Sequence, residues 1–186
     1  KINNKYKAFH IIRDPRAVVS SFKKISFGDK YDYLYGIFNW LDSYNYYLKY
    51  KKKFNTKRYL FLKFEDIHNY PKLISKKILD FANLPLDNNL MNNSYWKKKL
   101  LDNNSYVNFS AYNNLKQYGF NKKRINNWQN NLKKWEISLI QNLLDNEMSD
   151  LGYDALDLYE DKKLFKDGLK KIRSVKKFKR YLDNLI

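Results

Sequence analysis

The chain has 186 residues and a hydrophobic fraction of 44%, which suffices for a folded core and excludes wholesale disorder. Its formal net charge of +18 favours acidic partners, namely nucleic acid, phosphate cofactors, anionic glycans or a membrane surface. Compositional drift is an equally good explanation, because Lys and Asn are over-used along the whole chain. The absence of cysteine excludes disulfides and thiolate metal sites and favours a reducing compartment, the cytoplasm.

The first regular elements are predicted near the start of the chain. Residues 8–12 (AFHII) form an apolar run that predicts a strand buried on both faces in a parallel sheet. Asp14 and Pro15 predict the N-cap and first position of a helix over 15–25. A second helix is predicted over about 33–51, because apolar residues recur there at three- and four-residue spacing.

The aromatic residues of this second helix fit core packing better than a stacking platform for sugars or bases. Trp40 is expected inside, and Tyr46, Tyr47 and Tyr50 are expected to reach the surface.

Strand and helix then alternate, which predicts an α/β domain. Residues 58–64 (RYLFLKF) read as a strand, and Pro71 opens a helix that ends near residue 83. Residues 86–127 are rich in Asn and are expected to be mostly loop. Beyond them, an amphipathic helix is predicted over about 135–151, ended by Gly152, and a basic helical tail completes the chain.

The turn between the first strand and the first helix carries the candidate site. In open α/β sheets, ligands bind beyond the carboxyl ends of the strands, where Arg13 lies. A helix N-terminus suits an anion, and the arginine fork matches phosphate. At about 100° per residue, Ser21 is expected on the inward flank of the helix and Ser20 in solvent. Arg13 and Ser21 therefore either share a phosphate, or Arg13 pairs with a carboxylate and Ser21 bonds back to its own helix.

Three segments resemble the PAPS-dependent sulfotransferases. FHIIRDPRAVVSSF (9–22) is similar to their 3'-phosphate-binding segment, in which a strand ends in Arg-Asp-Pro-Arg and a serine follows the first arginine by eight positions. YLFLKFEDIHNYPKLISKKILDFANLP (59–85) resembles their strand, Tyr-Glu-Asp-Leu and helix, with Phe64 in place of the usual Tyr. Residues 124–154 resemble their tryptophan-containing loop, late helix and terminal Leu-Gly-Tyr. The sequence Arg-Asp-Pro-Arg-Ala-Val resembles that of the carbohydrate-type members of the family.

The resemblance implies a three-layer α/β/α, P-loop-like fold with a parallel sheet, of which this chain lacks the N-terminal part. Residues 1–155 would form the α/β domain and residues 156–186 the basic tail. The implied reaction moves a sulfonyl group from PAPS to a hydroxyl or amine of a glycan or similar acceptor, in line and without a metal. The glycine-rich phosphosulfate loop and the catalytic base, a His or Glu, would precede Lys1. The catalytic residue is therefore unassigned, and the chain alone is expected to be inactive.

The resemblance also implies roles for cofactor-binding residues. Arg13 and Ser21 would bind the 3'-phosphate and so fix the donor. The basic loop before Trp128 would close over the nucleotide, with Arg124 as a further phosphate contact. Lys122 and Lys123 are rivals for that role, and solvated loop charges are the plain alternative.

Other polar residues invite structural interpretations. His10 is expected to be a hydrogen-bonded core residue rather than a general base. His68 is expected at the surface or in a capping role, and two such distant histidines make no metal site. Asp66, beside Glu65, is expected to brace neighbouring loops.

Two rival functions remain open. The charge and the aromatic residues suit a nucleic-acid-binding module, although no nucleic-acid motif is present and no specific nucleic acid is expected. A sulfotransferase-like scaffold without activity is the other rival. The tail either contacts a membrane surface or anionic polymer, or it docks on the domain through a stripe of apolar residues: Phe165, Leu169, Ile172, Val175, Phe178 and Leu182.

Overall fold

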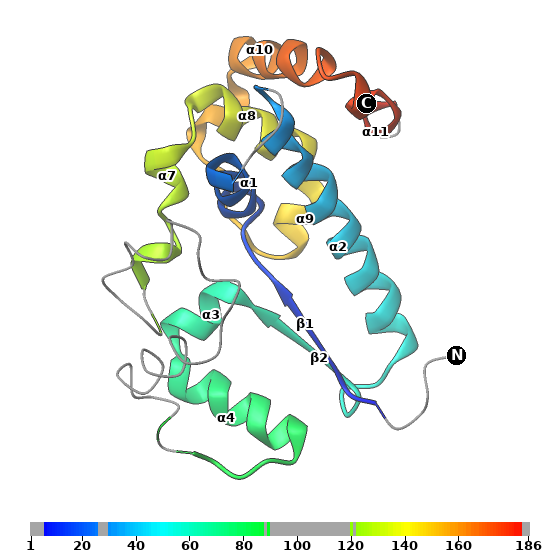
Figure 1. The fold of residues 1–186 in the computed structure, drawn as a ribbon, viewed down its shortest axis with the longest axis vertical. Coiled ribbons are helices and arrows are strands. Elements are labelled where there is room, and N and C mark those ends of the chain that lie inside the picture. Colours follow the sequence, from blue (N-terminus) through cyan, green and yellow to red (C-terminus); the bar gives the residue numbers. More distant parts are fainter. Residues whose placement is uncertain (1–5, 26–29, 88, 90–119, 121, 184–186) are drawn as a thin grey trace. The chain divides into compact units, whose positions relative to one another are not determined.

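The structure is a computed structural model, which describes residues 6–25, 30–87, 89, 120 and 122–183 (Figure 1). The chain divides into two compact units, the first formed by Lys1–Ile11 with Phe54–Ile125 and the second by Ile12–Lys53 with Asn126–Ile186. In the part of the chain that is described, every helix is too short or too polar to cross a membrane.

The first unit holds a two-stranded sheet. Strands β1 (Ala8–Ile12) and β2 (Tyr59–Lys63) pair and run in the same direction, with the amide of Ala8 donating to the carbonyl of Arg58 at 2.9 Å (Figure 1). Only Ile12, the last residue of β1, is assigned to the second unit. The predicted strands and their parallel pairing are therefore confirmed, as is the α/β class that they indicate.

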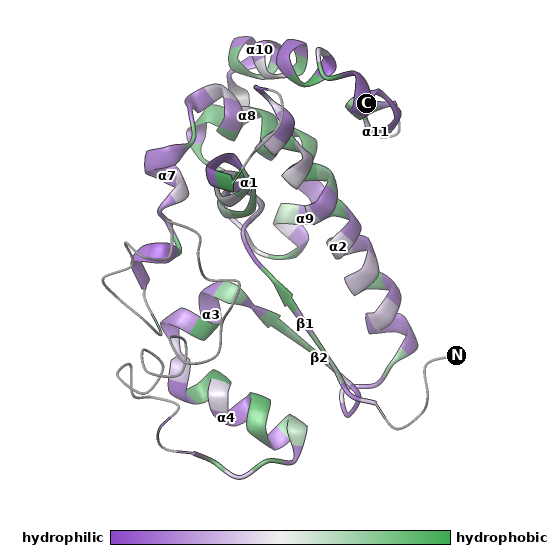
Figure 2. Ribbon diagram, in the orientation of Figure 1, coloured by the Kyte–Doolittle hydropathy of each residue, from purple (hydrophilic) through white to green (hydrophobic). Residues whose placement is uncertain are grey.

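Two helices and a short 3-10 turn complete the first unit. Helix α3 (Phe64–Asn69) follows β2 directly, α4 (Pro71–Ala82) begins at the predicted proline, and η3 spans Lys122–Arg124. Asn83 ends α4 in a left-handed conformation with φ 58°. Apolar and polar residues alternate along α4 (Figure 2), and the apolar ones Ile74, Ile78 and Phe81 pack on β2. The core of this unit comprises Leu60, Leu62, Ile67, Ile74, Ile78 and Phe81.

Strand β1 is less buried than its sequence predicts. Phe9 is 44% exposed and Ile11 is 52% exposed, so the expectation of a strand buried on both faces is wrong for the described structure. The ring of Phe9 packs edge-to-face against the ring of Phe81, with a distance of 4.9 Å between their centroids. The apolar run correctly predicted the strand but not how much of it is covered.

The second unit is helical apart from the end of β1. Its elements are α1 (Pro15–Ile25), η1 (Asp32–Leu34), α2 (Tyr35–Lys53), α7 (Trp128–Asn131), α8 (Lys134–Leu143), α9 (Asp145–Asp150), η4 (Asp157–Glu160), α10 (Lys162–Arg173), η5 (Lys176–Phe178) and α11 (Lys179–Leu182). Helix α1 packs on α2, α7 and α8, and α8 packs on α9 and α10.

The basic tail packs on this helical unit through its apolar stripe. Phe178 is fully buried between Tyr35 and Phe38 of α2, and Tyr181 stacks on Phe38 at 4.7 Å. Lys177 forms an ion pair with Asp32 at 2.7 Å. These side chains therefore dock on the domain, which is one of the two expectations for the tail. The polar residues of α10 lie on its exposed face (Figure 2).

Some boundaries differ from the predictions. The late helix predicted over about 135–151 is two helices, α8 and α9, that meet at Leu144, which leaves helical geometry at φ −124° and ψ 24°. Gly152 follows α9 with φ 64°, where a residue with a side chain is strained. Most of the loop predicted over 86–127 lies outside the described residues. The division into a domain and a tail at residue 155 stays a prediction.

Candidate functional site

The turn between β1 and α1 has the predicted cap. Asp14 accepts the backbone N–H of Arg16 through Oδ1 at 2.8 Å, and its own carbonyl accepts the amide of Val18 at 3.0 Å. Pro15 takes the first helical position, where its missing N–H has no consequence. The N-terminal end of α1, with its positive dipole end, therefore begins directly beside Arg13.

Arg13 and Ser21 lie next to each other. Nη1 of Arg13 is 3.5 Å from Oγ of Ser21, the outer limit of a hydrogen bond, so the contact is close but weak. Ser21 also donates to the carbonyl of Ala17 at 3.0 Å. Its hydroxyl therefore bonds back to its own helix, which is one of the two arrangements that the sequence left open. The oxygen keeps lone pairs for a donor such as Arg13. The two side chains thus converge on one place beside the second turn of α1.

The expected orientation of the two serines is partly wrong. Ser20 is buried rather than in solvent, and Ser21 is half-buried. Helix α1 is covered on a wide arc, because α2, α7 and α8 all pack on it. A rule based on one buried face therefore misjudges Ser20.

The backbone of Arg13 is held by α2. The indole Nε1 of Trp40 donates to the carbonyl oxygen of Arg13 at 2.6 Å. Trp40 is buried, as predicted, and stacks on Tyr44 at 5.8 Å. Tyr44 in turn donates to Asp150 at 3.0 Å. On the same helix Tyr46 is exposed as expected, whereas Tyr47 is buried, which corrects the expectation for that residue.

The second arginine of the motif is the residue that the sequence did not explain. Arg16 sits in the first turn of α1, where a cation opposes the helix dipole, yet its side chain is buried. Its anionic neighbour is Asp14, which it pairs with at 2.7 Å. The ring of Trp128 covers the guanidinium at 4.2 Å. Only the short Asp14–Arg16 spacing hinted at this pair, since the other contacts come from distant parts of the chain.

A second buried ion pair ties α1 to α8. The carboxylate of Glu136 is 1% exposed and accepts Nζ of Lys23 at 2.8 and 2.7 Å. It also accepts the backbone N–H of Lys133 at 2.5 Å and the hydroxyl of Tyr33. Burial, and then the bond to Glu136, raise the pKa of Tyr33 far above its usual range. These contacts are structural, because they satisfy a carboxylate that would otherwise be buried alone.

Arg124, the third predicted site residue, lies in η3 of the first unit, whereas Arg13 and Ser21 lie in the second. Its side chain is half-buried, while those of Lys122 and Lys123 are exposed. The structure thus brings two of the three predicted residues together, and the role of Arg124 stays a prediction.

The histidines have structural surroundings. Nδ1 of His10 is 2.6 Å from the hydroxyl of Tyr59, and burial lowers the pKa of His10. His68 is buried between the rings of Phe64 and Phe120, which corrects the expectation of a surface position. The described residues contain no group of three His, Asp or Glu side chains placed to hold a metal ion.

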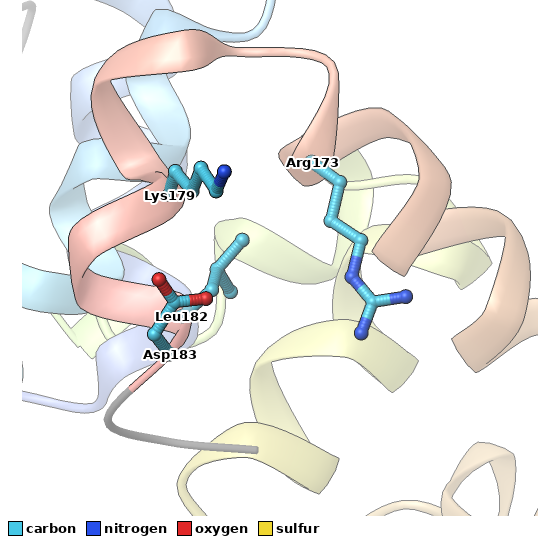
Figure 3. A pocket seen from close by; sticks show the side chains of 4 residues that line it. All are labelled: Arg173, Lys179, Leu182 and Asp183. Atoms are coloured by element: carbon cyan, nitrogen blue, oxygen red, sulfur yellow. The ribbon is translucent and has the colours of Figure 1, made fainter.

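Two cavities in the second unit contain none of the predicted site residues. The larger, of about 550 Å³, is lined by Arg173 on one side and by Lys179, Leu182 and Asp183 on the other (Figure 3). Its lining has both charge signs, so it shows no clear preference for an anion. The smaller, of about 220 Å³, lies beside Gln141 and Asp154.

The comparison with protein families matches the sulfotransferase domain over residues 1–152. Among solved structures, the chain is similar to the sulfotransferase domain from the Synechococcus PCC 7002 olefin synthase, with 21% identity over 66% of this chain and 42% of that one and a TM-score of 0.50. It is also similar to the sulfotransferase domain from the curacin biosynthetic pathway, with 18% identity over 81% of this chain and 54% of that one and a TM-score of 0.52. No curated protein matches in sequence.

The chain spans about half the length of the two solved domains, and at these identities the likeness shows the fold alone. The family match is the stronger finding, because it covers the Arg13 turn, β2, α8 and the Leu151-Gly152-Tyr153 segment up to its glycine. It agrees with the resemblance seen in the three sequence segments. The chain belongs to the sulfotransferase domain family and has its α/β fold.

Proposed function

We propose that the protein transfers a sulfonyl group from PAPS to a hydroxyl or amine of its acceptor, and that Arg13 and Ser21 bind the 3'-phosphate of the donor. The observation that carries this proposal is the convergence of Nη1 of Arg13 and Oγ of Ser21, 3.5 Å apart beside the second turn of α1. Membership of the sulfotransferase domain family supports it.

The chemistry of the two side chains suits a phosphate. The planar guanidinium offers parallel donors to two phosphate oxygens. The serine hydroxyl would add a third donor by rotating from the carbonyl of Ala17 to the phosphate. Neither group takes part in the sulfonyl transfer itself. They fix the donor so that its sulfonyl group meets the acceptor in line, which is catalysis by positioning.

Arg124 is our candidate for a further phosphate contact. It ends the basic turn η3, and its side chain is more buried than those of Lys122 and Lys123 before it. An arginine in a short basic turn before Trp128 fits the loop that closes over the nucleotide in this family. We expect Arg124→Ala to weaken nucleotide binding less than Arg13→Ala, because Arg124 contributes from a loop rather than from a helix-braced turn.

For the acceptor, we propose a glycan hydroxyl, because the sequence Arg-Asp-Pro-Arg-Ala-Val at residues 13–18 resembles that of carbohydrate-type sulfotransferases. The two solved relatives come from an olefin synthase and the curacin pathway, and at 18–21% identity they do not argue for or against this acceptor class. A screen of hydroxyl-bearing acceptors with labelled PAPS tests it. Transfer to a non-carbohydrate alcohol in preference to every glycan offered would contradict the proposal. The same assay excludes an inactive scaffold if any acceptor is sulfated.

The binding proposal is tested by titrating adenosine 3',5'-bisphosphate (PAP), the product of the donor, into the intact protein in a calorimeter. We expect Arg13→Ala to reduce the affinity by about 100-fold, which is the usual cost of about 2–3 kcal/mol for a charge-assisted contact. Ser21→Ala should cost about tenfold. Lys24→Ala is the matched control, because Lys24 is an exposed cation on the same helix. Equal affinities for wild type and Arg13→Ala would refute the role of Arg13.

A second candidate function, the binding of a polynucleotide, is favoured by one observation. Of the twelve exposed residues between 161 and 183, nine are Lys or Arg. At about 100° per residue, those on α10 lie within one arc of roughly 100°, so they form a stripe along its outer face. Such a stripe on a basic chain suits a phosphate backbone. The nine are Lys162, Lys163, Lys166, Lys170, Arg173, Lys176, Lys177, Lys179 and Arg180.

Charge reversal separates this candidate from a general effect of net charge. Changing Lys162, Lys166 and Lys170 to Glu reverses three of the five exposed cations on α10, and changing Lys72, Lys76 and Lys77 to Glu on α4 alters the net charge equally. A polynucleotide-binding stripe predicts steeply salt-dependent binding that only the first triple variant loses. Equal losses in both variants, or a flat salt response of the wild type, would remove this candidate.

A further inference from the structure

Arg16 connects four separate parts of the second unit. Its Nε and Nη2 donate to the carboxylate of Asp14 at 2.7–3.2 Å. Its Nη1 donates to Oε1 of Gln141 and to the carbonyl of Asp154, each at 2.9 Å. The ring of Trp128 covers its face. Arg16 is 4% exposed, so its guanidinium bonds to protein groups instead of water.

These contacts fix the residue that follows Arg13. Asp14 is 5% exposed, and both of its carboxylate oxygens are held by the Arg16 fork. The next residue, Pro15, has a fixed φ and adds stiffness. On the other side, Trp40 holds the carbonyl of Arg13 at 2.6 Å. The backbone from Arg13 to Asp14 is therefore restrained at both of its peptide groups.

Arg16 also controls the charge of this turn. Asp14 directly follows Arg13, and an uncompensated carboxylate there would compete with an anionic ligand for the Arg13 guanidinium. Pairing with Arg16 offsets the charge of that carboxylate. A lysine has no fork that bonds Asp14, Gln141 and Asp154 at fixed angles, so the geometry requires arginine.

We propose that Arg16 is a positioning residue for the phosphate site, which does not touch the nucleotide but sets the direction in which Arg13 meets it. This inference rests on the proposed function of Arg13. It extends that function by linking the turn through Gln141 to α8 and to Leu156, whose backbone N–H and carbonyl bond the Gln141 amide at 3.1 and 3.2 Å. The turn is thereby braced by the segment that follows the family-matched residues.

The alternative is that Arg16 only fastens α1 to α8. The Lys23–Glu136 pair provides the comparison, because it also joins α1 to α8 through a buried carboxylate, about two helical turns further along. Among the described residues, the ammonium of Lys23 bonds to Glu136 and to the carbonyl of Asn131, and not to Arg13 or Asp14. A purely structural role predicts the same behaviour for both pairs, whereas positioning predicts a difference in ligand affinity.

The test compares Arg16→Met with Lys23→Met in the intact protein. Both variants leave a buried carboxylate with fewer partners, so both should lower the melting temperature. We expect Arg16→Met to weaken PAP binding at least about tenfold, because small displacements of an anion clamp are costly. Lys23→Met should bind within about twofold of wild type. Wild-type affinity in Arg16→Met, or an equal loss in both variants, would overturn the inference.

A double variant keeps the test informative if Arg16→Met does not fold. Asp14→Asn with Arg16→Met retains a good N-cap and leaves no unpaired buried charge, so it should regain stability. Its PAP affinity should stay at least about fivefold below wild type, because nothing orients the turn. Wild-type affinity in the double variant would overturn positioning. Absence of PAP binding by the wild type is a separate result, and it would refute the proposed function instead.

Discussion

Gly168, in the middle of α10, lies directly against Leu139 of α8. A Cβ placed on Gly168 would lie 2.9 Å from Cβ of Leu139 on α8 and 3.2 Å from its Cδ1. The nearest atom belongs to the start of the Leu139 side chain, which no rotamer change moves. An alanine at 168 therefore requires the two helices to separate.

The magnitude follows from two opposing terms. Alanine gains about 1 kcal/mol over glycine inside a helix, and overpacking of this kind costs about 1–3 kcal/mol. We expect Gly168→Ala to lower the free energy of unfolding by about 1 kcal/mol, or the melting temperature by about 2–4 °C. Gly168→Val should cost about 3 kcal/mol, because it adds branched atoms to the same contact.

The assay is denaturant unfolding followed by circular dichroism, with Lys170→Ala as the control on the exposed face of α10. The control should change stability by no more than about 0.5 kcal/mol. A gain of about 1 kcal/mol in Gly168→Ala would show the helix-propensity term acting alone. That result would refute the packing of α10 on α8.

Three further changes test other contacts. Burial lowers the pKa of His10 below 6.5, so the stability present above about pH 6.5 is lost as the pH falls. The free energy of unfolding should therefore fall between pH 7.5 and 5.5 in the wild type and vary less with pH in His10→Gln. The same pH dependence in both proteins would contradict this. Trp40→Phe removes the donor to the Arg13 carbonyl and should cost about 1–2 kcal/mol in chemical unfolding, whereas a neutral result would contradict that bond. Tyr44→Phe should cost about 1 kcal/mol in the same assay because Asp150 loses the hydroxyl that donates to it, and an unchanged free energy of unfolding would contradict this contribution.

Local signals in the sequence predicted the elements around the site well. The apolar run over residues 8–12 and the Asp14-Pro15 cap gave the bounds of β1 and α1, because each signal acts within a few residues. The spacing of Arg13 and Ser21, just over two turns of helix, likewise placed them side by side. Helix α3 was missed because it follows β2 without a turn residue between them.

The remaining features depend on contacts that no local pattern encodes. Arg16 is bonded to Gln141 and Asp154, 125 and 138 positions further along the chain, so its burial could not be read from its own segment. The break at Leu144 has no glycine or proline to mark it, and the burial of Ser20 follows from three helices packing on α1. The tail was predicted to have an apolar stripe, but only tertiary structure shows that it packs on α2 and α8.

The most direct test of the central claim is a cycle of four dissociation constants, for PAP and 5'-AMP with wild type and with Arg13→Ala. The two ligands differ only in the 3'-phosphate, so the cycle isolates its interaction with Arg13 from every other effect of the mutation. The account predicts that the wild type prefers PAP by at least about 100-fold and that Arg13→Ala loses most of this preference. An equal preference in both proteins would contradict it.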